Sequence, residues 1–420
     1  MAVLAGDLLL PLLLVACDRS PTTISGPLPQ RGYLWQRDWT PAVTAALTEA
    51  QQKMQGVVLL GVEVEWVEKR PCVVRANIAW ERVKTEAVPC SIALRVAPFS
   101  GPFGPDDSAL RRIADVAKSL LNEARAHRAE VQEFQLDYDC PQKNLAHYRA
   151  WLRQLRAVVH PTRFVITTLP AWLDEKEFAR LVREVDGYVL QVHSVATASA
   201  GRAKLCDTRA ARRWVAMAAK FHQPFSVALP TYRCTAGYNG AGKLIGVAMD
   251  SVQPSWPPET RRLDFAADAD EIAALVHEWE LARPTELREL LWYRIPVATD
   301  ARNWRWPTLK AVMAGRNPTR RFEIVREGEN PVDLSIRNAG ESDDDRPETV
   351  VANWSSGELV AADALAGWNV RTQKQRAVFT VAPGHRLRMP PGAERRIGWL
   401  RYAAPVRLDL SFQNENKVVR

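Results

Sequence analysis

Two acidic side chains end an apolar segment in the stretch FQLDYDCP at residues 134–141. Side chains on a β-strand alternate between its faces, so Asp137 and Asp139 would share one face with Gln135. Two carboxyl groups held this close repel each other, which raises the pKa of one of them. The pair can then divide into a proton donor and a charged stabiliser, as cleavage of a glycosidic bond requires.

Other apolar segments that are predicted as strands also end in polar or aromatic side chains. These residues are Glu63, Arg95, Gln191, His193, Tyr232, Trp292 and Arg294. In a barrel of parallel strands, the carboxyl ends meet at one mouth, where active sites lie. A purely structural barrel would fill its interior with Val, Ile and Leu, so this convergence predicts a binding or catalytic site.

Eight short apolar segments predict the strands that position these side chains. They cover residues 33–35, 57–64, 91–97, 133–139, 163–169, 187–193, 225–232 and 290–295. Amphipathic segments with a period near 3.6 lie between most of them, at 107–126, 145–158, 175–185, 208–221 and 268–281. Alternating strands and helices predict parallel strands, and eight such units favour a closed TIM-type (β/α)8 barrel over a doubly wound open sheet.

The pattern changes after Gly315, where apolar and polar residues alternate in short segments separated by Gly, Pro and Asn turns. Strands are predicted at 321–326, 332–337, 349–354, 377–381 and 406–412. Such alternation is typical of an antiparallel sheet with one face in the core. We therefore expect a barrel at 31–315 and a small antiparallel β-sandwich at 316–420. The acidic run at 343–345 is interpreted as a solvated loop tip.

The N-terminus carries a short apolar run, residues 8–16, that ends in LVAC at 14–17. The run is too short to span a bilayer but fits the centre of a signal peptide, and LVAC resembles a bacterial lipobox. Residues 1–17 are thus interpreted as a lipoprotein signal with Cys17 as the lipidated residue, and residues 18–30 as a linker. Asp18 resembles the signal for inner-membrane retention. We expect a periplasmic protein that contacts the membrane only through this N-terminal lipid anchor.

Composition excludes some classes of partner. The net charge of +8 is spread along the chain and forms no basic cluster, which argues against nucleic acid. The chain has no glycine fingerprint of the dinucleotide or P-loop type, and no cofactor is expected.

Five cysteines remain beside the lipidated one, and an odd number leaves at least one thiol unpaired in a monomer. In an oxidising compartment, Cys72–Cys90 and Cys206–Cys234 are candidate disulfides. Cys140 would then be a free thiol beside the acidic pair.

The stretch QLDYDCP resembles the strand-four signature of chitinase-type (family eighteen) glycoside hydrolases, Asp-x-Asp-x-Glu followed by an aromatic residue and Pro. Asp137 and Pro141 keep their positions, whereas Gln135 replaces the first Asp and Asp139 replaces the catalytic Glu. The resemblance also implies that Trp292 forms the floor of a sugar site. Asp139 would place its acid about 1–1.5 Å further back than Glu, which bears against the N-acetyl-assisted mechanism of that family.

A second resemblance covers most of the chain. The segments YLWQRDWTPAV, PFSVALPTY and LLWYRIPVATDARNW are similar to a bacterial family called domain of unknown function 3142. Members of that family look like exported lipoproteins or secreted proteins with a barrel. The resemblance implies a fold and implies no activity.

The first functional hypothesis is a glycoside hydrolase. Asp139 would be the general acid, Asp137 the stabiliser of positive charge, and Glu63 the second carboxylate, acting as base or nucleophile. The residues expected to contact the glycan are Gln135, Arg95, Gln191, His193, Tyr232, Trp292 and Arg294. Two arginines at the mouth favour an anionic glycan such as a uronate.

The second hypothesis is a non-catalytic glycan-binding or scaffolding lipoprotein on a degenerate hydrolase barrel, which the residues at 135 and 139 favour. A third is a metal-dependent hydrolase using Asp137, Asp139 and His193. Only one His joins two acids there, so no metal is expected.

Overall fold

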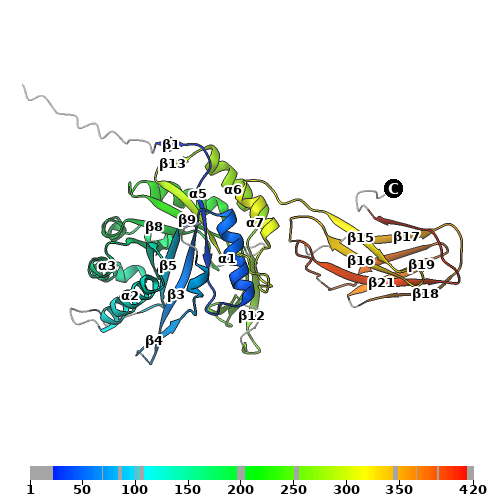
Figure 1. Cartoon of the computed structure of the whole chain (residues 1–420), viewed down its shortest axis with the longest axis horizontal. Coiled ribbons are helices and arrows are strands. Elements are labelled where there is room, and N and C mark those ends of the chain that lie inside the picture. The colour runs from blue at the N-terminus through cyan, green and yellow to red at the C-terminus, as the bar shows by residue number, and fades with distance from the viewer. Residues whose placement is uncertain are drawn as a thin grey trace, which may run out of the picture.

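The structure is a computed structural model that describes residues 22–413 except 69, 84–87, 100, 102, 104–107, 196–203, 250–254, 344–348, 366 and 386. A barrel covered by helices is followed by a separate all-β domain (Figure 1). The lipobox at 14–17 lies outside the described residues. Within the described ranges, no helix has both the length and the apolar character needed to cross a membrane.

Parallel strands close the barrel. They are β2 (Gln30–Leu34), β3 (Gly56–Val67), β5 (Cys90–Val96), β6 (Val131–Tyr138), β7 (Arg163–Thr168), β8 (Gly187–Gln191), β9 (Phe225–Pro230) and β14 (Leu287–Tyr293). Each strand pairs with the next in chain order, and β2 pairs with both β14 and β3. The predicted TIM-type (β/α)8 barrel is confirmed, because a doubly wound sheet would have two open edges.

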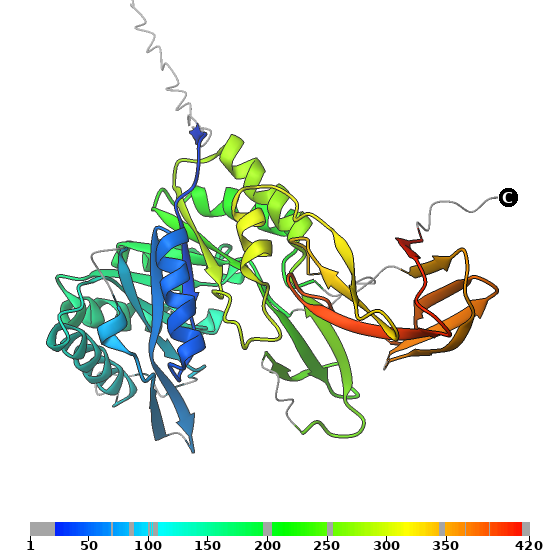
Figure 2. The ribbon, with the colours of Figure 1, turned by 45° about the vertical axis from the view of Figure 1, so that its right-hand side comes forward.

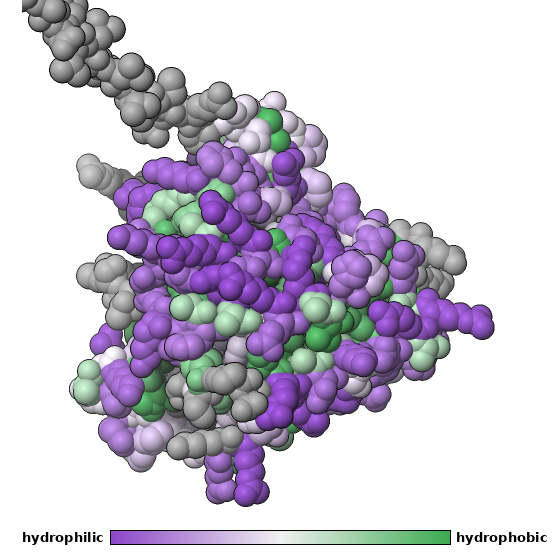
Figure 3. Space-filling view, turned by 90° about the vertical axis from the view of Figure 1, so that its left-hand side faces the viewer, coloured by the Kyte–Doolittle hydropathy of each residue, from purple (hydrophilic) through white to green (hydrophobic). Residues whose placement is uncertain are grey.

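Helices cover the outer face of the barrel. They are α1 (Pro41–Lys53), α2 (Ser108–Ala126), α3 (Leu145–Val159), α4 (Lys176–Leu181), α5 (Thr208–Ala219), α6 (Ala269–Leu281) and α7 (Trp306–Met313). The apolar stripe of α2, with Ile113, Ala117 and Leu120, is buried against the sheet. Figure 3 shows the opposite, outward side of such helices, where hydrophilic side chains dominate and apolar ones form small patches.

Two antiparallel insertions extend the barrel at its carboxyl end. Strand β4 (Arg70–Arg75) folds back on β3, where the sequence shows no clean helix. A second sheet, not predicted from the sequence, contains β10 (Arg233–Tyr238), β11 (Leu244–Ala248) and β12 (Arg261–Ala266). Both project from the same end of the barrel (Figure 2). They therefore flank the mouth.

The segment before the barrel packs against it. Strand β1 (Thr23–Ile24) pairs with β13 (Arg283–Pro284), and the Gly26 N–H donates to the Glu280 carbonyl at 2.8 Å. Leu28 is buried. The prediction of a tether at 18–30 is therefore wrong for this part, because its backbone and apolar groups find partners on the barrel.

The C-terminal domain consists of two antiparallel sheets with a shared core. One contains β15 (Phe322–Glu327), β16 (Val332–Asn338), β21 (Glu394–Tyr402) and β18 (Leu359–Ala364). The other contains β19 (Trp368–Gln373), β20 (Arg376–Val381), β17 (Val350–Trp354) and β22 (Leu408–Phe412). Leu334, Ile336 and Phe379 lie in the core. The predicted antiparallel β-domain is confirmed, although β18, β19 and β21 were not predicted.

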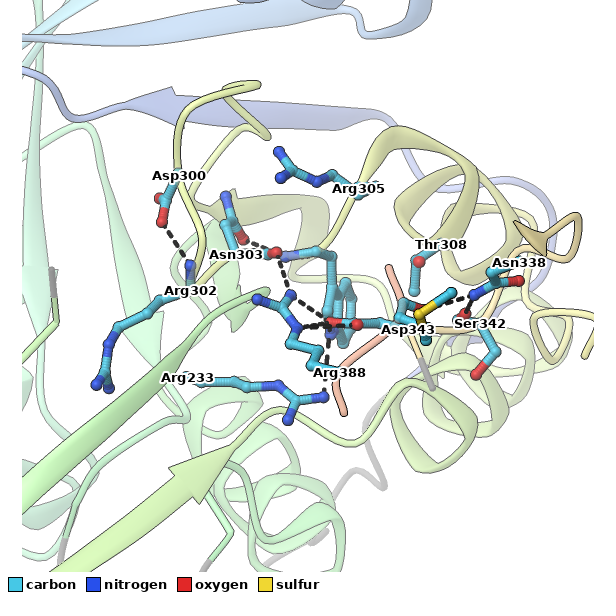
Figure 4. Close-up of polar contacts among 12 residues, drawn as sticks. Arg233, Asp300, Arg302, Asn303, Arg305, Thr308, Asn338, Ser342, Asp343 and Arg388 are labelled. Carbon is cyan, nitrogen blue, oxygen red and sulfur yellow. Dashed lines mark hydrogen bonds and ion pairs between the residues drawn. The ribbon is translucent and has the colours of Figure 1, made fainter. Parts of the chain in front are cut away.

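Asp343 joins this domain to the barrel. Arg388 donates to its carboxylate, and the Nη2 of Arg233 on β10 lies 3.5 Å from Oδ2. Arg388 Nη2 also donates to the Asn303 carbonyl of the barrel at 2.9 Å (Figure 4). Only 4% of the Asp343 side chain is exposed, so the prediction of a solvated tip is wrong for this residue. The next two acids lie outside the described residues.

The five cysteines among the described residues are free thiols. The predicted Cys72–Cys90 disulfide is wrong because Cys72 pairs with Glu65 and Cys90 with Val57, near opposite ends of β3. At about 3.3 Å per residue these levels are roughly 26 Å apart, far beyond the reach of a disulfide. The Cys206–Cys234 pair does not form either, since the two thiols are packed in different apolar clusters.

Candidate functional site

A cavity of about 1040 Å³ opens at the carboxyl ends of the barrel strands. Most of the polar residues predicted from the sequence line it: Glu63, Arg95, Asp137, Asp139, Gln191, His193, Tyr232 and Arg294. Gln135 and Trp292 do not. The parallel topology thus brings side chains from six strands or strand ends to one cavity, as expected for a barrel mouth.

Asp137 is held by three hydrogen-bond donors. Arg95 Nη1 donates to Oδ2 at 2.5 Å, and Thr167 Oγ1 donates to Oδ1 at 2.7 Å. Gln191 Nε2 also donates to Oδ1, at 3.3 Å. Because only 6% of its side chain is exposed, Asp137 presents a negative charge in a fixed orientation at the bottom of the cavity.

Asp139 lies next to this group and closer to solvent. Its side chain is 33% exposed and accepts a hydrogen bond from Arg95 Nη2 at 3.3 Å. Burial and the neighbouring charge of Asp137 raise its pKa, although Arg95 opposes the shift. A raised pKa allows Asp139 to keep its proton closer to neutral pH. Asp139 is therefore the carboxyl group of the pair that is suited to donate a proton.

Glu63 lies at the same level as this pair. The strand register aligns Glu63 with Arg95, and Arg95 with Asp137, across β3, β5 and β6. Strands lie about 4.8 Å apart, so the backbones of Glu63 and Asp137 are roughly 10 Å apart. Arg37 forms an ion pair with Glu63. Glu63 and Asp137 thus lie at one level of the barrel wall, on the two strands that flank the strand of Arg95.

His193 is a neutral member of the cavity wall. Its ring stacks on Tyr293 with 5.6 Å between the centroids, and its Nδ1 lies 3.5 Å from the Tyr232 hydroxyl. Burial lowers the pKa of His193 to about 4, although Asp137 opposes the shift. At neutral pH this imidazole can exchange hydrogen bonds but carries no charge.

Three aromatic rings that the sequence analysis did not select also line the cavity. Tyr33, Trp35 and Tyr293 meet edge to face, with centroids 5.4, 5.8 and 5.5 Å apart. Their edges and faces offer apolar surface of the kind on which sugar rings stack. The alternation along the strand could have identified Tyr293, because Tyr293 and its neighbour Trp292 point to opposite faces of the sheet.

The prediction of Trp292 as a stacking floor is wrong. Its side chain is fully buried in the core between strands and helices, and its Nε1 donates to Gln30 Oε1 at 2.8 Å. Tyr293, on the other face of β14, lines the cavity instead.

Gln135 faces the barrel interior as predicted, but it lies one level below the cavity. It is fully buried, accepts from the Tyr33 hydroxyl at 2.8 Å, and donates to Glu133 Oε1 at 2.7 Å. The prediction that it contacts a ligand is therefore wrong. Through Tyr33 it supports the aromatic wall.

Arg294 is paired with an acid that the sequence analysis did not select. Its Nη2 lies 2.7 Å from Asp300 Oδ2, and both residues line the cavity. Asn303 holds the same loop, because its Nδ2 donates to the carbonyls of Arg294 and Ile295 at 2.9 and 3.1 Å. The C-terminal domain contacts this loop through Arg388 (Figure 4), so it supports one edge of the mouth.

The described residues contain no group of three or more His, Cys, Asp or Glu side chains arranged to hold a metal ion. Asp137, Asp139 and His193 therefore do not form the centre that the metal-dependent hypothesis requires.

The geometry defines a TIM-type barrel with a carboxylate pair and aromatic rings at its mouth, followed by an antiparallel β-domain. Residues 105–298 match the model of the domain of unknown function DUF3142, the family that the sequence resembles. Residues 324–403 match a second domain of unknown function, DUF8456. No curated protein sequence matches the chain.

Solved structures of similar fold include the spore cortex-lytic enzyme SleL of Bacillus megaterium, at 11% identity and a TM-score of 0.48, covering 70% of this chain and 75% of that one. A chitinase of Chromobacterium violaceum has 11% identity and a TM-score of 0.46, covering 69% and 98%. A class V chitinase of Pseudomonas fluorescens has 15% identity and a TM-score of 0.45, covering 69% and 99%.

Proposed function

We propose that the protein is a glycoside hydrolase that acts on a glycan bound at the mouth of the barrel. The observation that carries this proposal is the pair formed by Asp137 and Asp139 on one wall of a large cavity. Their environments differ: Asp137 is fixed by three donors, whereas the pKa of Asp139 is raised. Such a division of roles is what glycosidic cleavage needs.

In the proposed reaction, Asp139 donates its proton to the glycosidic oxygen as the bond from that oxygen to the anomeric carbon breaks. Asp137 stabilises the positive charge that develops on the sugar ring. Glu63 takes a proton from the water whose oxygen bonds to the anomeric carbon. We assign Glu63 as a base rather than a nucleophile because its strand is two positions away from that of the pair, which leaves room for water.

The remaining cavity residues would hold the sugar. Tyr33, Trp35 and Tyr293 provide surfaces for stacking, and Gln191, His193 and Tyr232 provide neutral hydrogen-bonding groups. Asp139 is shorter by one methylene than the Glu of chitinase-type enzymes, so its reach depends on how deeply the sugar enters.

The test is release of reducing ends from a panel of oligosaccharides. We expect Asp139→Asn to lower turnover by about 10²- to 10⁴-fold, the usual contribution of a general acid. Asp115→Asn, on the exposed face of α2, is the matched control and should leave turnover unchanged. Asp139→Glu should retain turnover because it keeps the proton donor. Full turnover in Asp139→Asn would overturn the assignment.

A second candidate function is glycan binding without turnover. The observation that favours it is that Arg95 contacts both acids, which stabilises their charged forms and competes with proton donation. In this case a glycan array would show binding and no reducing ends would appear. Tyr293→Ala would weaken the binding, whereas Asp139→Asn would change it little.

We also propose that the protein is exported and anchored by lipid at Cys17, on the basis of the LVAC stretch and the apolar run before it. Metabolic labelling with palmitate should mark the wild-type protein in the membrane fraction. Cys17→Ser should abolish the label, whereas labelling that persists in this variant would refute the anchor.

A further inference from the structure

The cavity wall carries more negative than positive groups, although the chain as a whole has a net charge of +8. Among the residues that the structure describes, the carboxyl groups that line it belong to Asp38, Glu63, Asp137, Asp139 and Asp300, and the guanidinium groups to Arg37, Arg95 and Arg294. These five carboxylates against three guanidiniums give the described part of the wall a net charge of −2, or −1 when Asp139 holds its proton. The mouth therefore repels anions that come within about one Debye length of the solution.

The three arginines are also committed to acids of the same wall. Arg37 pairs with Glu63, and Arg294 pairs with Asp300. Arg95 lies between Asp137 and Asp139. A uronate carboxylate would have to displace one of these partners, and it would leave that acid without its counter-ion. The anionic glycan expected from the arginines alone is thus disfavoured.

Groups that accept hydrogen bonds or attract cations remain available at the same wall. Gln36 Oε1 is buried in the cavity lining, and no donor among the described residues reaches it. Asp38 is exposed at the rim. The rings of Tyr33, Trp35 and Tyr293 offer π-faces, which attract ammonium groups. An acceptor, a carboxylate and aromatic faces together are complementary to an ammonium ion.

We propose that the ligand of this cavity is a cationic glycan, an oligosaccharide of amino sugars whose amines are free rather than acetylated. The inference rests on the proposed function only in using the same cavity as the glycan site. It deepens that function by specifying the charge of the substrate, which the carboxylate pair alone does not determine.

Calorimetric titration of the Asp139→Asn variant tests the inference without turnover. Three ligands of equal length serve as probes: glucosamine pentamer, its fully N-acetylated form and a pentameric uronate. At pH 6, where a primary amine is protonated, we expect the glucosamine pentamer to bind at least about tenfold tighter than either other ligand. The advantage should shrink as salt rises from 20 to 300 mM, because screening weakens attraction between partly exposed charges.

Paired variants locate the effect. Asp38→Asn should reduce the preference for the free amine by about two- to fivefold, the range for an exposed charge pair. Asp115→Asn, on the outer face of α2, is its matched control and should leave the preference unchanged. Equal or tighter binding of the uronate, or a preference insensitive to Asp38→Asn and to salt, would overturn the inference.

The outcomes separate this inference from the proposed function. Cleavage of a uronate or acetylated glycan, with no preference for the free amine, would support the hydrolase activity and contradict the cationic ligand. Preferential binding of the glucosamine pentamer with no turnover by the wild type would support the cationic ligand and contradict the hydrolase activity. If none of the three ligands binds, the cationic inference fails, and the reducing-end panel alone decides the hydrolase.

Discussion

The two ends of the barrel both contain charged side chains, but they use them in opposite ways. At the amino ends of the strands, Arg31 lies 2.9 Å from Glu133 and 2.6 Å from Glu289, and Arg163 also pairs with Glu133. Burial by itself would raise the pKa of Glu133. The positive charges of Arg31 and Arg163 outweigh this effect and bring the pKa below its ordinary value. At the mouth, by contrast, the pKa of Asp139 is raised.

The difference lies in how the charges are balanced. In the lower network the cations are sufficient to neutralise the acids, and Ser91 and Gln135 supply further hydrogen bonds. At the mouth a single arginine serves two acids beside an open cavity. A network in which cations balance acids stabilises the barrel, whereas a network with an excess of acid can titrate or bind a ligand. Variants that remove single charged or titratable side chains test this difference.

The largest effect on stability is expected in the lower network. Arg31→Met should lower the free energy of unfolding by about 3–5 kcal/mol, because it leaves two acids buried without their shared cation. Arg95→Met should cost only about 1 kcal/mol, since this side chain is 32% exposed and its acids reach the cavity. Urea titrations followed by tryptophan fluorescence measure both. Equal losses would remove the distinction between the two ends.

A smaller loss is expected where the β-domain meets the mouth. Asp343→Asn should lower the stability of the contact by about 1.5–3 kcal/mol, since charge-assisted bonds to Arg388 and Arg233 are lost. Asp363→Asn, an exposed substitution on β18, is the control. Calorimetry should show the transitions of the barrel and the β-domain moving apart only in the first variant. Unchanged transitions would mean that this ion pair does not couple the domains.

The neutral imidazole at the mouth should make stability depend on pH. Its pKa falls from 6.5 to about 4 on folding, so the unfolded chain binds more protons between these values. The contribution of His193 is therefore present above pH 6.5 and is lost as pH falls, by up to roughly 1.4 kcal/mol per unit. His193→Gln should flatten this part of the stability profile, whereas His385→Gln, exposed on the β-domain, should not. The same slope in both variants would contradict the assignment.

The smallest predicted effect is on the titration of the acid pair itself. Arg95 opposes the rise in the pKa of Asp139, so Arg95→Met should raise this pKa further. If the protonated acid is the active form, the alkaline limb of the pH–rate profile moves to higher pH. Carbon-13 NMR of the aspartate carboxyl groups gives the same information without a substrate. A shift toward lower pH would show that Arg95 does not control the pair.

The sequence predicts correctly those features that depend on the two-residue alternation of side chains along a strand. The alternation along residues 134–139 places Phe134 and Leu136 against the helices and Asp137 toward the cavity, as expected. The prediction was wrong for Trp292, because Tyr293 is the residue of β14 that points into the cavity. Arg294 lines the cavity as well, but it lies beyond the end of the strand.

Features that depend on distant residues were missed. Arg31 and Glu289 are 258 positions apart in the chain, and no local sequence pattern predicts their contact. Asp343 reads as part of a solvated acidic loop, yet residues of both domains bury it. The sheet of β10, β11 and β12 was overlooked because it interrupts the expected alternation of strands and helices.

By itself, the sequence determined the closed barrel, the β-domain and the acids that face the mouth, because periods of 2 and 3.6 residues report which side chains are buried. Only the tertiary structure decided which acids share an arginine, which aromatic rings line the cavity and that the charge of the wall is negative. Those properties depend on distances between strands far apart in the chain, and electrostatic interactions follow these distances rather than sequence order.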